Sequence, residues 1–350
     1  MRIAQIAPLT ESVPPRTYGG TERVVSYLTE ELMAMGHDVT LFASGDSVTS
    51  AKLEAGWPHA LRLDTTLRDA MAPTMLMMEK VCQQAHQFDV LHGHLDYWPF
   101  SLLSRQPTPL LTTLHGRLDL PELAQVYDCF EDMPLVSISD AQRRPVPRGN
   151  FIATVHHGLP PNLLTPRSLP RDYLAFLGRI CPEKSPDRAI RIARAAGIKL
   201  KIAAKIDRVD REYFETEIRP LIDGDQVEMI GEIGDAEKPA FLGGAIAMLL
   251  PIDWPEPFGL VMIEAMACGT PTIAFPAGSV PEVIDDGVTG YIVANEAAAV
   301  AAVSRLDRLS PTAIRARFEE RFTARRMAED YLELYRRMAV KSRPALRMVT

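Results

Sequence analysis

The chain has 350 residues, which is too many for one ordinary core and about right for two domains. Hydrophobic residues make up 47% and charged residues 24%, a composition typical of globular proteins. The formal net charge of −7 argues against nucleic acid as a partner, and no apolar run approaches the ~20 residues that a membrane-spanning helix needs.

The cysteines and the first residues both bear on location. Met1–Pro8 holds an apolar stretch that is too short for a secretory signal. No pair of cysteines has the spacing of a metal finger or a redox motif; the four are Cys82, Cys129, Cys181 and Cys268. We therefore expect a reducing, cytoplasmic location.

Short apolar runs alternate with helical patterns from end to end, which predicts parallel sheets built from strand–helix–strand crossovers. The runs lack polar alternation, as expected for strands that are covered on both faces. The predicted strands of the first half are Ile3–Ala7, Val39–Ala43, Val90–His92, Leu110–Leu114, Leu135–Ile138 and Ile152–Val155. Those of the second half are Tyr173–Leu177, Leu200–Ala203, Val227–Ile230, Met248–Leu250, Thr272–Ala274 and Tyr291–Val293.

Helices are predicted between these strands. The first carries an apolar stripe and ends near Gly36; its stripe is Val24, Val25, Leu28, Leu32 and Met35. The last, from about Thr323 to Ala339, is amphipathic and bears many arginines interleaved with glutamates. The proline-rich stretch His157–Pro170 predicts a link between two α/β domains.

A glycine pair lies between the first strand and the first helix, in the segment Thr17-Tyr18-Gly19-Gly20-Thr21-Glu22. Paired glycines let backbone amides approach a phosphate or a sugar where a Cβ would clash. An ordinary loop is the alternative. The segment lacks the G-x-G-x-x-G spacing of a dinucleotide site.

Two cations follow the first strand of the second half. Arg179 and Lys184 could balance the two negative charges of a diphosphate without a metal ion. Arginine can bind two oxygens at once, whereas lysine acts as a mobile point charge. The alternative is a solvated pair at a helix start.

Two carboxylates frame a glycine further along the chain. Glu256 and Glu264 flank Gly259, where the chain can turn tightly and begin a helix. Glu264 suits a ribose diol and Glu256 suits sugar hydroxyls, so both would hold one long ligand. Their apolar setting, rich in glycine and proline, disfavours the alternative of two solvated glutamates.

Three histidines lie at the ends of predicted strands. His115 precedes a glycine at the carboxyl end of a buried strand, where open α/β sheets bind ligands, although it could instead be a core histidine. His92 and His94 with Asp96 form a possible metal set, which would make a metal-dependent hydrolase. We expect instead a polar strand end, with Asp96 touching an acceptor, and no metal.

These segments, in this order, resemble retaining family 4 glycosyltransferases of the GT-B fold over nearly the whole chain. Glu256 to Glu264 resembles the E-x7-E signature of that family. Gly178-Arg179-Ile-Cys-Pro-Glu-Lys184 resembles its Gly-Arg-x-x-x-x-Lys motif, except that Ser185 replaces the usual glycine. Tyr18-Gly19-Gly20 resembles its glycine loop, and Thr113-Leu-His115-Gly116 its donor-sugar histidine segment.

The resemblance implies two Rossmann-like, doubly wound parallel-sheet domains facing a central cleft. The expected divisions are residues 1–160 on the acceptor side, 171–322 for the nucleotide sugar, and 323–350 as a helix packing back on the first domain. It also implies roles for single residues. Arg179 and Lys184 would bind the diphosphate, with the amides of Gly259, Leu260 and Val261. Glu264 would hold the ribose, and Glu256 and His115 the donor sugar.

We therefore expect a retaining, metal-independent glycosyltransferase of carbohydrate biosynthesis that moves a sugar, such as a hexose, by a front-face mechanism. The donor would be a UDP-, GDP- or ADP-sugar, with no further cofactor. The acceptor would bear a hydroxyl and be a saccharide, a lipid-linked molecule or a small molecule. A nucleotide-sugar-binding protein without catalysis is the alternative. The basic last helix leaves weak peripheral membrane contact open.

Overall fold

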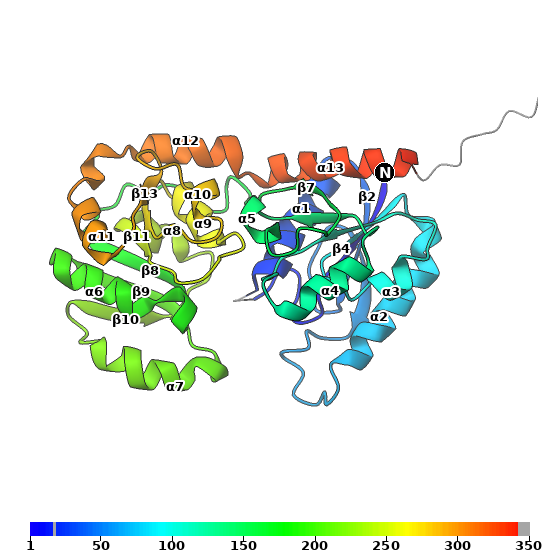
Figure 1. Ribbon diagram of the computed structural model, residues 1–350, viewed down its shortest axis with the longest axis horizontal. Coiled ribbons are helices and arrows are strands. Elements are labelled where there is room, and N and C mark those ends of the chain that lie inside the picture. The colour runs from blue at the N-terminus through cyan, green and yellow to red at the C-terminus, as the bar shows by residue number, and fades with distance from the viewer. Residues whose placement is uncertain (17–18, 342–350) are drawn as a thin grey trace, which may run out of the picture. The chain divides into compact units, whose positions relative to one another are not determined.

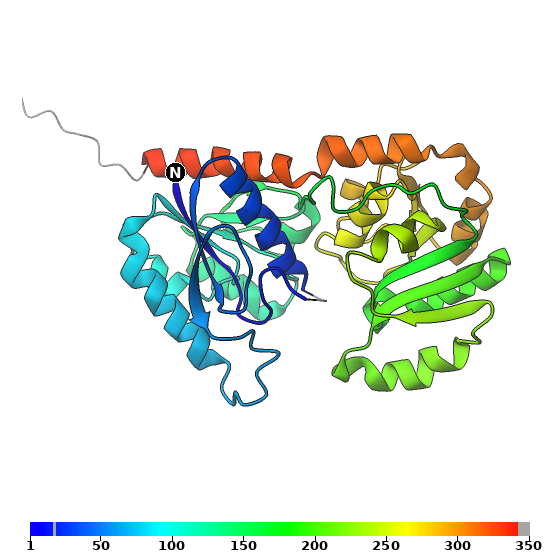
Figure 2. The ribbon, with the colours of Figure 1, turned by 180° about the vertical axis from the view of Figure 1, so that it is seen from behind.

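The computed structural model describes residues 1–16 and 19–341, and the chain divides into two compact units. Unit 1 comprises Met1–Gly158 and the chain from Ala324 onward, whereas unit 2 comprises Leu159–Thr323. In each unit a parallel sheet is flanked by helices (Figures 1 and 2). Both units therefore have the α/β architecture that the alternating pattern predicts.

The sheet of unit 1 has seven parallel strands in the order β3-β2-β1-β4-β5-β6-β7. Ile3 of β1 pairs with Val39 on one side and with Val90 on the other. The strand order reverses at β1 and β4, and ligands of such sheets bind beyond the carboxyl ends of the strands at this point. The strands are β1 (Arg2–Ile6), β2 (Asp38–Ser44), β3 (Lys52–Trp57), β4 (Val90–Gly93), β5 (Leu110–Thr113), β6 (Leu135–Ser137) and β7 (Phe151–Thr154).

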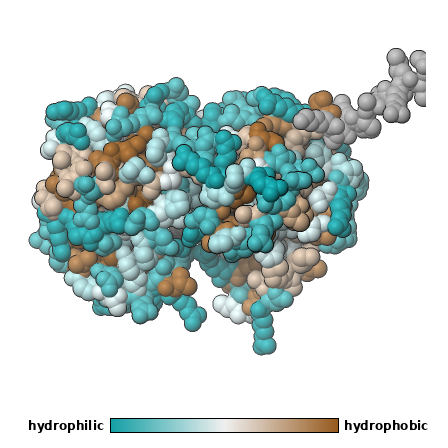
Figure 3. Space-filling model, viewed as in Figure 1, coloured by the Kyte–Doolittle hydropathy of each residue, from teal (hydrophilic) through white to brown (hydrophobic). Residues whose placement is uncertain are grey.

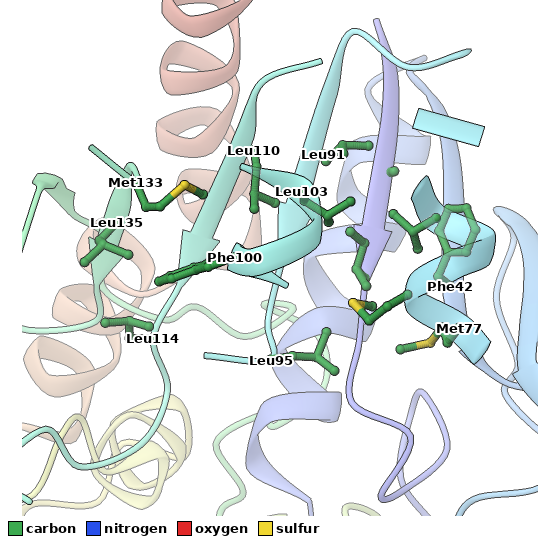
Figure 4. Packing of buried hydrophobic residues seen from close by; sticks show 14 of the residues in the cluster. Phe42, Met77, Leu91, Leu95, Phe100, Leu103, Leu110, Leu114, Met133 and Leu135 are labelled. Atoms are coloured by element: carbon green, nitrogen blue, oxygen red, sulfur yellow. The ribbon is translucent and has the colours of Figure 1, made fainter. Parts of the chain in front are cut away.

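Strand β2 shows how the sheet of unit 1 is buried on both faces. Phe42 packs into a large cluster with Met77 and Leu91 (Figure 4). Leu41 and Ala43, one position away on either side, pack into a second cluster. Successive side chains of a strand point to opposite faces, so an unbroken apolar run is what this strand needs.

Helices cover both faces of this sheet. In α1 the predicted stripe residues Val24, Val25, Leu28 and Leu32 are buried, whereas Met35 follows the last helical residue and is half-buried. Gly36, just beyond the helix, has φ +80, which glycine adopts without strain. The last helix, α13, packs on α1 and β4 and so completes unit 1. The helices are α1 (Gly20–Ala34), α2 (Met71–Gln84), α3 (Phe100–Leu103), α4 (Pro121–Cys129), α5 (Asp140–Arg143) and α13 (Ala324–Lys341).

The sheet of unit 2 has six parallel strands in the order β10-β9-β8-β11-β12-β13. Here the order reverses at β8 and β11. The strands are β8 (Tyr173–Arg179), β9 (Lys199–Lys205), β10 (Val227–Gly231), β11 (Ala245–Leu250), β12 (Thr272–Ala274) and β13 (Gly290–Ile292). The helices are α6 (Pro186–Ala196), α7 (Arg211–Tyr213), α8 (Lys238–Gly243), α9 (Leu260–Ala267), α10 (Val280–Val283), α11 (Glu296–Val303) and α12 (Pro311–Arg321).

Every predicted strand overlaps an observed one, but β3 was not predicted. Lys52–Trp57 pairs only with β2 at the sheet edge and carries Lys52 and Glu54, which form an ion pair. An edge strand needs no continuous apolar run, and charged side chains there discourage pairing with other chains. The hydrophobic signal of a central strand is therefore missing from this segment.

The predicted link is packed rather than free. Leu159 and Leu164 are fully buried, and Arg315 of α12 donates hydrogen bonds to the carbonyl oxygens of Pro161 and Leu164. The segment therefore belongs to unit 2 from Leu159 onward.

Hydrophilic side chains cover most of the face in Figure 3, and the hydrophobic ones gather in separate patches. Among residues 1–16 and 19–341, none of the helices has the length and hydropathy needed to cross a bilayer.

Candidate active site

At the reversal point of the unit 2 sheet, the loop from β11 to α9 carries Glu256, and α9 itself carries Glu264. Gly259 ends this loop with φ +74, and α9 begins at Leu260, as predicted. A Cβ on Gly259 would lie 2.8 Å from Met262 Cε and 3.2 Å from Glu256 Cγ. Only glycine fits both that backbone conformation and that space.

The N-terminus of α9 is a place for an anion. The first amides of an α-helix have no acceptor inside the helix, and the helix dipole adds partial positive charge there. The first amides of α9 belong to Leu260 and Val261, which with Gly259 are half-buried and so still reachable from solvent. Buried apolar side chains on the rest of α9 hold the helix in place. This end of the helix can bind a phosphate group.

Glu256 is held firmly beside the start of α9. Its Oε2 forms an ion pair with Lys184 Nζ and accepts a hydrogen bond from Trp254 Nε1 at 3.1 Å. Lys184 Nζ also lies 4.9 Å from the centre of the Trp254 ring, a cation–π contact. Two donors on one oxygen leave Glu256 Oε1 without a hydrogen bond from the described residues.

A second loop holds the backbone of Glu256. The amide of Ser279 donates to the Glu256 carbonyl oxygen at 2.9 Å, and Ser279 Oγ donates to the Phe258 carbonyl oxygen at 2.8 Å. Gly278 lies so close that a Cβ would be 2.3 Å from both the nitrogen and the oxygen of Glu256. The loop after β12 thus fixes the carboxylate through its backbone.

The predicted cation pair lies at the carboxyl end of β8, where Arg179 is the last residue of the strand and Lys184 belongs to the turn that follows. Lys184 ends a short 3-10 turn, and the next residue, Ser185, has φ +50. The motif that this segment resembles has glycine at this position. Here a serine adopts the left-handed conformation that glycine favours. Arg179 contacts two aspartates rather than Glu256: its Nε lies 3.4 Å from Asp210 Oδ2 and its Nη1 3.8 Å from Asp207 Oδ2. About a third of its side chain is exposed, so a ligand can reach it.

Glu264, on α9, forms a buried ion pair that the sequence analysis missed. Lys238 Nζ lies 2.6 Å from Glu264 Oε1 and 3.2 Å from Asp235 Oδ1. Lys238 is the first residue of α8, where the helix dipole disfavours a cation. A lysine at such a position, followed directly by proline, is the signal that could have pointed to a buried partner.

A cavity of about 460 Å³ in unit 2 was also not predicted. It lies beyond the carboxyl ends of β11, β12 and β13, which is the edge where parallel sheets bind ligands. Its polar lining comes from Arg188, Asp253, Asn295 and Glu296. The residues lie in segments without a motif, so only their meeting in space identifies the cavity.

In unit 1, His115 lies two residues beyond β5 and contacts two other histidines. Its Nε2 lies 2.9 Å from His94 Nδ1, and its ring stacks on that of His157 with the centroids 5.3 Å apart. Burial lowers the pKa of His115 to about 3, so the ring is neutral at neutral pH. Burial also raises the pKa of Asp96, and a hydrogen bond from the His115 backbone amide opposes that rise.

His92 does not have the free nitrogen that a metal ligand needs. Its Nδ1 lies 2.6 Å from the Tyr335 hydroxyl and its Nε2 lies 2.7 Å from Thr113 Oγ1. Within the described residues no group of three or more histidine, cysteine, aspartate or glutamate side chains could hold a metal ion. The hydrogen bonds of His92 argue against the hydrolase alternative.

The glycine pair opens α1. Gly20 is the first residue of the helix, and a Cβ on Gly19 would lie 2.8 Å from Pro15 Cβ. Thr17 and Tyr18, which belong to the same predicted segment, lie outside the described residues. The structure thus brings Glu256, Lys184 and Gly259 together in unit 2 and His115 with His94 in unit 1.

The two Rossmann-like units, each built on a parallel sheet, have the architecture of the GT-B fold. A family described as "Glycosyltransferase Family 4" matches residues 18–183, and one described as "Glycosyl transferases group 1" matches residues 166–322. The chain belongs to the family 4 glycosyltransferases.

Two relatives are named as sugar-transferring enzymes. A D-inositol 3-phosphate glycosyltransferase of Mycolicibacterium smegmatis is 31% identical over 47% of this chain, but the match spans only 39% of that protein. A phosphatidyl-myo-inositol mannosyltransferase of Propionibacterium freudenreichii is 27% identical over 87% of this chain and 86% of its own length.

Among solved structures, a sucrose-phosphate synthase of Thermosynechococcus elongatus shares the fold with a TM-score of 0.80 at 20% identity, covering 97% of this chain and 100% of that one. HepE of Anabaena, solved in complex with UDP-glucose, has a TM-score of 0.72 at 16% identity, covering 96% and 100%. At these identities the likeness establishes the fold.

Proposed function

We propose that the protein transfers a sugar, such as a hexose, from a nucleoside diphosphate sugar to a hydroxyl-bearing acceptor with retention of anomeric configuration. The observation that carries the proposal is the Lys184–Glu256 pair beside the N-terminus of α9. It combines a cation, helix amides and a fixed carboxylate at one edge of the unit 2 sheet. The relatives named above transfer sugars, which supports the same class of reaction.

In this proposal Arg179, Lys184 and the amides of Gly259, Leu260 and Val261 bind the diphosphate. Glu264 uses Oε2 to accept a ribose hydroxyl, because Oε1 is engaged with Lys238. Glu256 uses Oε1 in the same way for a hydroxyl of the transferred sugar. Gly19 and Gly20 let the backbone of unit 1 approach the ligand closely, and His115 accepts a hydroxyl of the donor sugar.

The chemical step breaks the bond between the anomeric carbon and the diphosphate oxygen. A new bond forms to the acceptor oxygen on the same face of the sugar, and the acceptor proton passes to the departing phosphate. Positive charge supplied by Arg179 and Lys184 stabilises the leaving group, so we propose that no metal ion is needed. No carboxylate acts as a nucleophile in this front-face route; Glu256 instead binds the sugar through Oε1, while its Oε2 stays with Lys184 and Trp254.

The donor class and the location are part of the proposal. A UDP-, GDP- or ADP-sugar would fit the diphosphate site, and UDP-glucose is the first to test because HepE of this fold was solved with it. The acceptor is a saccharide, a lipid-linked molecule or a small molecule. Four free cysteines and a nucleotide-sugar donor fit a cytoplasmic enzyme.

Calorimetry with a panel of nucleotide sugars and free nucleoside diphosphates, with and without EDTA, tests the proposal. We expect one donor to bind equally well with chelator and more weakly to Glu264→Ala. Glu228→Gln, which removes an exposed carboxylate paired with Lys199, is the matched control and should bind normally. NMR of the product with that donor reports the anomeric configuration. Binding without transfer to any hydroxyl acceptor would favour the non-catalytic alternative.

A further inference from the structure

A continuous chain of hydrogen-bonded side chains crosses unit 1 and ends at His115. It begins on α13 and passes through the sheet by way of β5, β4 and β1. In order, its members are Tyr331, Thr113, His92, Tyr335, Gln5, His94 and His115. The first six are fully or almost fully buried, so water does not replace these contacts.

Each link has hydrogen-bond length. The Tyr331 hydroxyl lies 2.9 Å from Thr113 Oγ1, and the Tyr335 hydroxyl lies 3.1 Å from Gln5 Nε2. Gln5 Oε1 lies 2.8 Å from His94 Nε2, and His94 Nδ1 lies 2.9 Å from His115 Nε2. With the two contacts of His92 described above, no link is missing.

The chain has a direction because Gln5 has one donor end and one acceptor end. Its Nε2 donates to the Tyr335 hydroxyl, and its Oε1 accepts from the N–H at His94 Nε2. A neutral imidazole carries only one N–H, so His94 Nδ1 must accept. His115 therefore donates from Nε2, and its Nδ1 is left with a lone pair and no proton.

That lone pair has no hydrogen-bond partner among the described residues, although the atom is buried. A buried acceptor without a donor costs free energy that a bound hydroxyl would recover. Burial lowers the pKa of both His94 and His115, so the rings stay neutral and the direction of the chain holds at neutral pH. A site at Nδ1 is thus prepared for a hydrogen-bond donor.

We propose that Gln5 and Tyr335 act through His94 to fix the tautomer of His115, so that Nδ1 accepts a hydrogen bond from a hydroxyl of the donor sugar. The identity of the hydroxyl rests on the proposed function, whereas the tautomer does not. Gln5, His94 and Tyr335 are positioning residues, since none of them needs to touch the sugar. Helix α13, which carries Tyr335, would then strengthen a ligand contact that it does not itself make.

The tautomer can be read directly in the full-length chain labelled with ¹⁵N-histidine, before any ligand is added. We expect His115 to show a protonated Nε2 and an unprotonated Nδ1. In Tyr335→Phe the orientation of Gln5 is no longer imposed. The ¹⁵N chemical shifts of the two ring nitrogens of His115 should therefore move toward each other, as expected when both tautomers are populated. Tyr331→Phe, on the same helix, removes a buried hydroxyl beyond Thr113 and should leave the tautomer unchanged. Gln5→Met should act as Tyr335→Phe does and serves if that variant folds poorly.

Binding provides the second readout. The ratio of the affinities for a nucleotide sugar and its free nucleoside diphosphate isolates the contact to the sugar. In Tyr335→Phe we expect this ratio to fall by about tenfold, the value of one hydrogen bond, with nucleoside diphosphate binding unchanged. An Nδ1 proton on His115 in the unsubstituted chain, or a tautomer insensitive to both Tyr335→Phe and Gln5→Met, overturns the inference. No donor binding by the unsubstituted chain would instead count against the proposed function and leave the tautomer result standing.

Discussion

Lys238 Nζ lies 2.6 Å from Glu264 Oε1, and at most a tenth of either side chain is exposed. Such a pair loses hydration on both sides, so each charge depends on the other. The lysine enters from the start of α8 and the glutamate from α9, and the pair therefore joins two helices of unit 2 across the predicted ribose position. Stability and donor binding should be coupled at this point.

Lys238→Met should destabilise unit 2 by about 3 kcal/mol, because it leaves the Glu264 carboxylate buried without its partner. Glu264→Gln should cost a similar amount, and the double substitution less than the sum. Urea denaturation of the four proteins gives the coupling energy. Additive effects would mean that the two charges do not stabilise each other.

Lys184→Ala and Arg179→Ala should each lower kcat by about 100-fold. Each substitution removes one positive charge that stabilises the departing diphosphate, which raises the activation free energy by ~2.7 kcal/mol. Lys199→Ala removes an exposed lysine of the same unit and is the matched control. Turnover is measured at saturating donor. Near-normal rates in both variants would contradict the assigned diphosphate site.

Gly278→Ala should greatly weaken donor binding, because its Cβ would lie 2.3 Å from backbone atoms of Glu256 and must displace that residue. Gly287→Ala is the control for backbone strain. Gly287 also has a left-handed φ of +75, but no atom lies within 4 Å of its Cβ position. It should lose only ~1 kcal/mol of stability and bind donor normally. Equal donor affinity in the two variants would show that the 278 loop does not position Glu256.

Unit 1 should lose stability as the pH falls below about 6.5. Burial lowers the pKa values of His92, His94, His115 and His157, so the unfolded chain takes up protons that the folded chain does not. The free energy of unfolding is therefore highest above the histidine pKa of the unfolded chain. Below that pKa it declines by up to ~1.4 kcal/mol per pH unit for each histidine.

Hydrogen exchange at amides of β1, β4 and β5 measures this decline in unit 1 alone. His115→Gln should make the free energy of unfolding of unit 1 fall less steeply with decreasing pH, by the contribution of one histidine. A stability that is flat between about pH 7 and pH 5.5 would mean that these rings already bind protons in the folded state.

The strands and the glycine turns were predictable because their signals are local. Gly259 and the helix after it follow from residues next to each other, and the central strands from unbroken apolar runs. Strand β3 lacked such a run because it lies at an edge. Ser185 broke the family pattern in sequence, yet its φ of +50 retains the backbone conformation that glycine would adopt there.

The ion pairs and hydrogen bonds that hold the site residues in place could not be found in the same way. Lys238 lies 26 residues from Glu264, and Tyr335 lies 330 residues from Gln5. Each pair meets only when the sheet order brings distant segments together. Single positions therefore indicated the ligand-binding chemistry, whereas the groups that orient them required the fold.

Unit 1 is built from two stretches of chain, with all of unit 2 lying between them in sequence. A ribosome therefore releases Leu159–Thr323 before it releases the helix that carries Tyr331 and Tyr335. Until that moment Gln5 and His92 have been made but lack the hydroxyls that they bond to, and a site beneath α13 stays open to water or to chaperones. The ligand-ready tautomer of His115 would be among the last features to form in each newly made molecule.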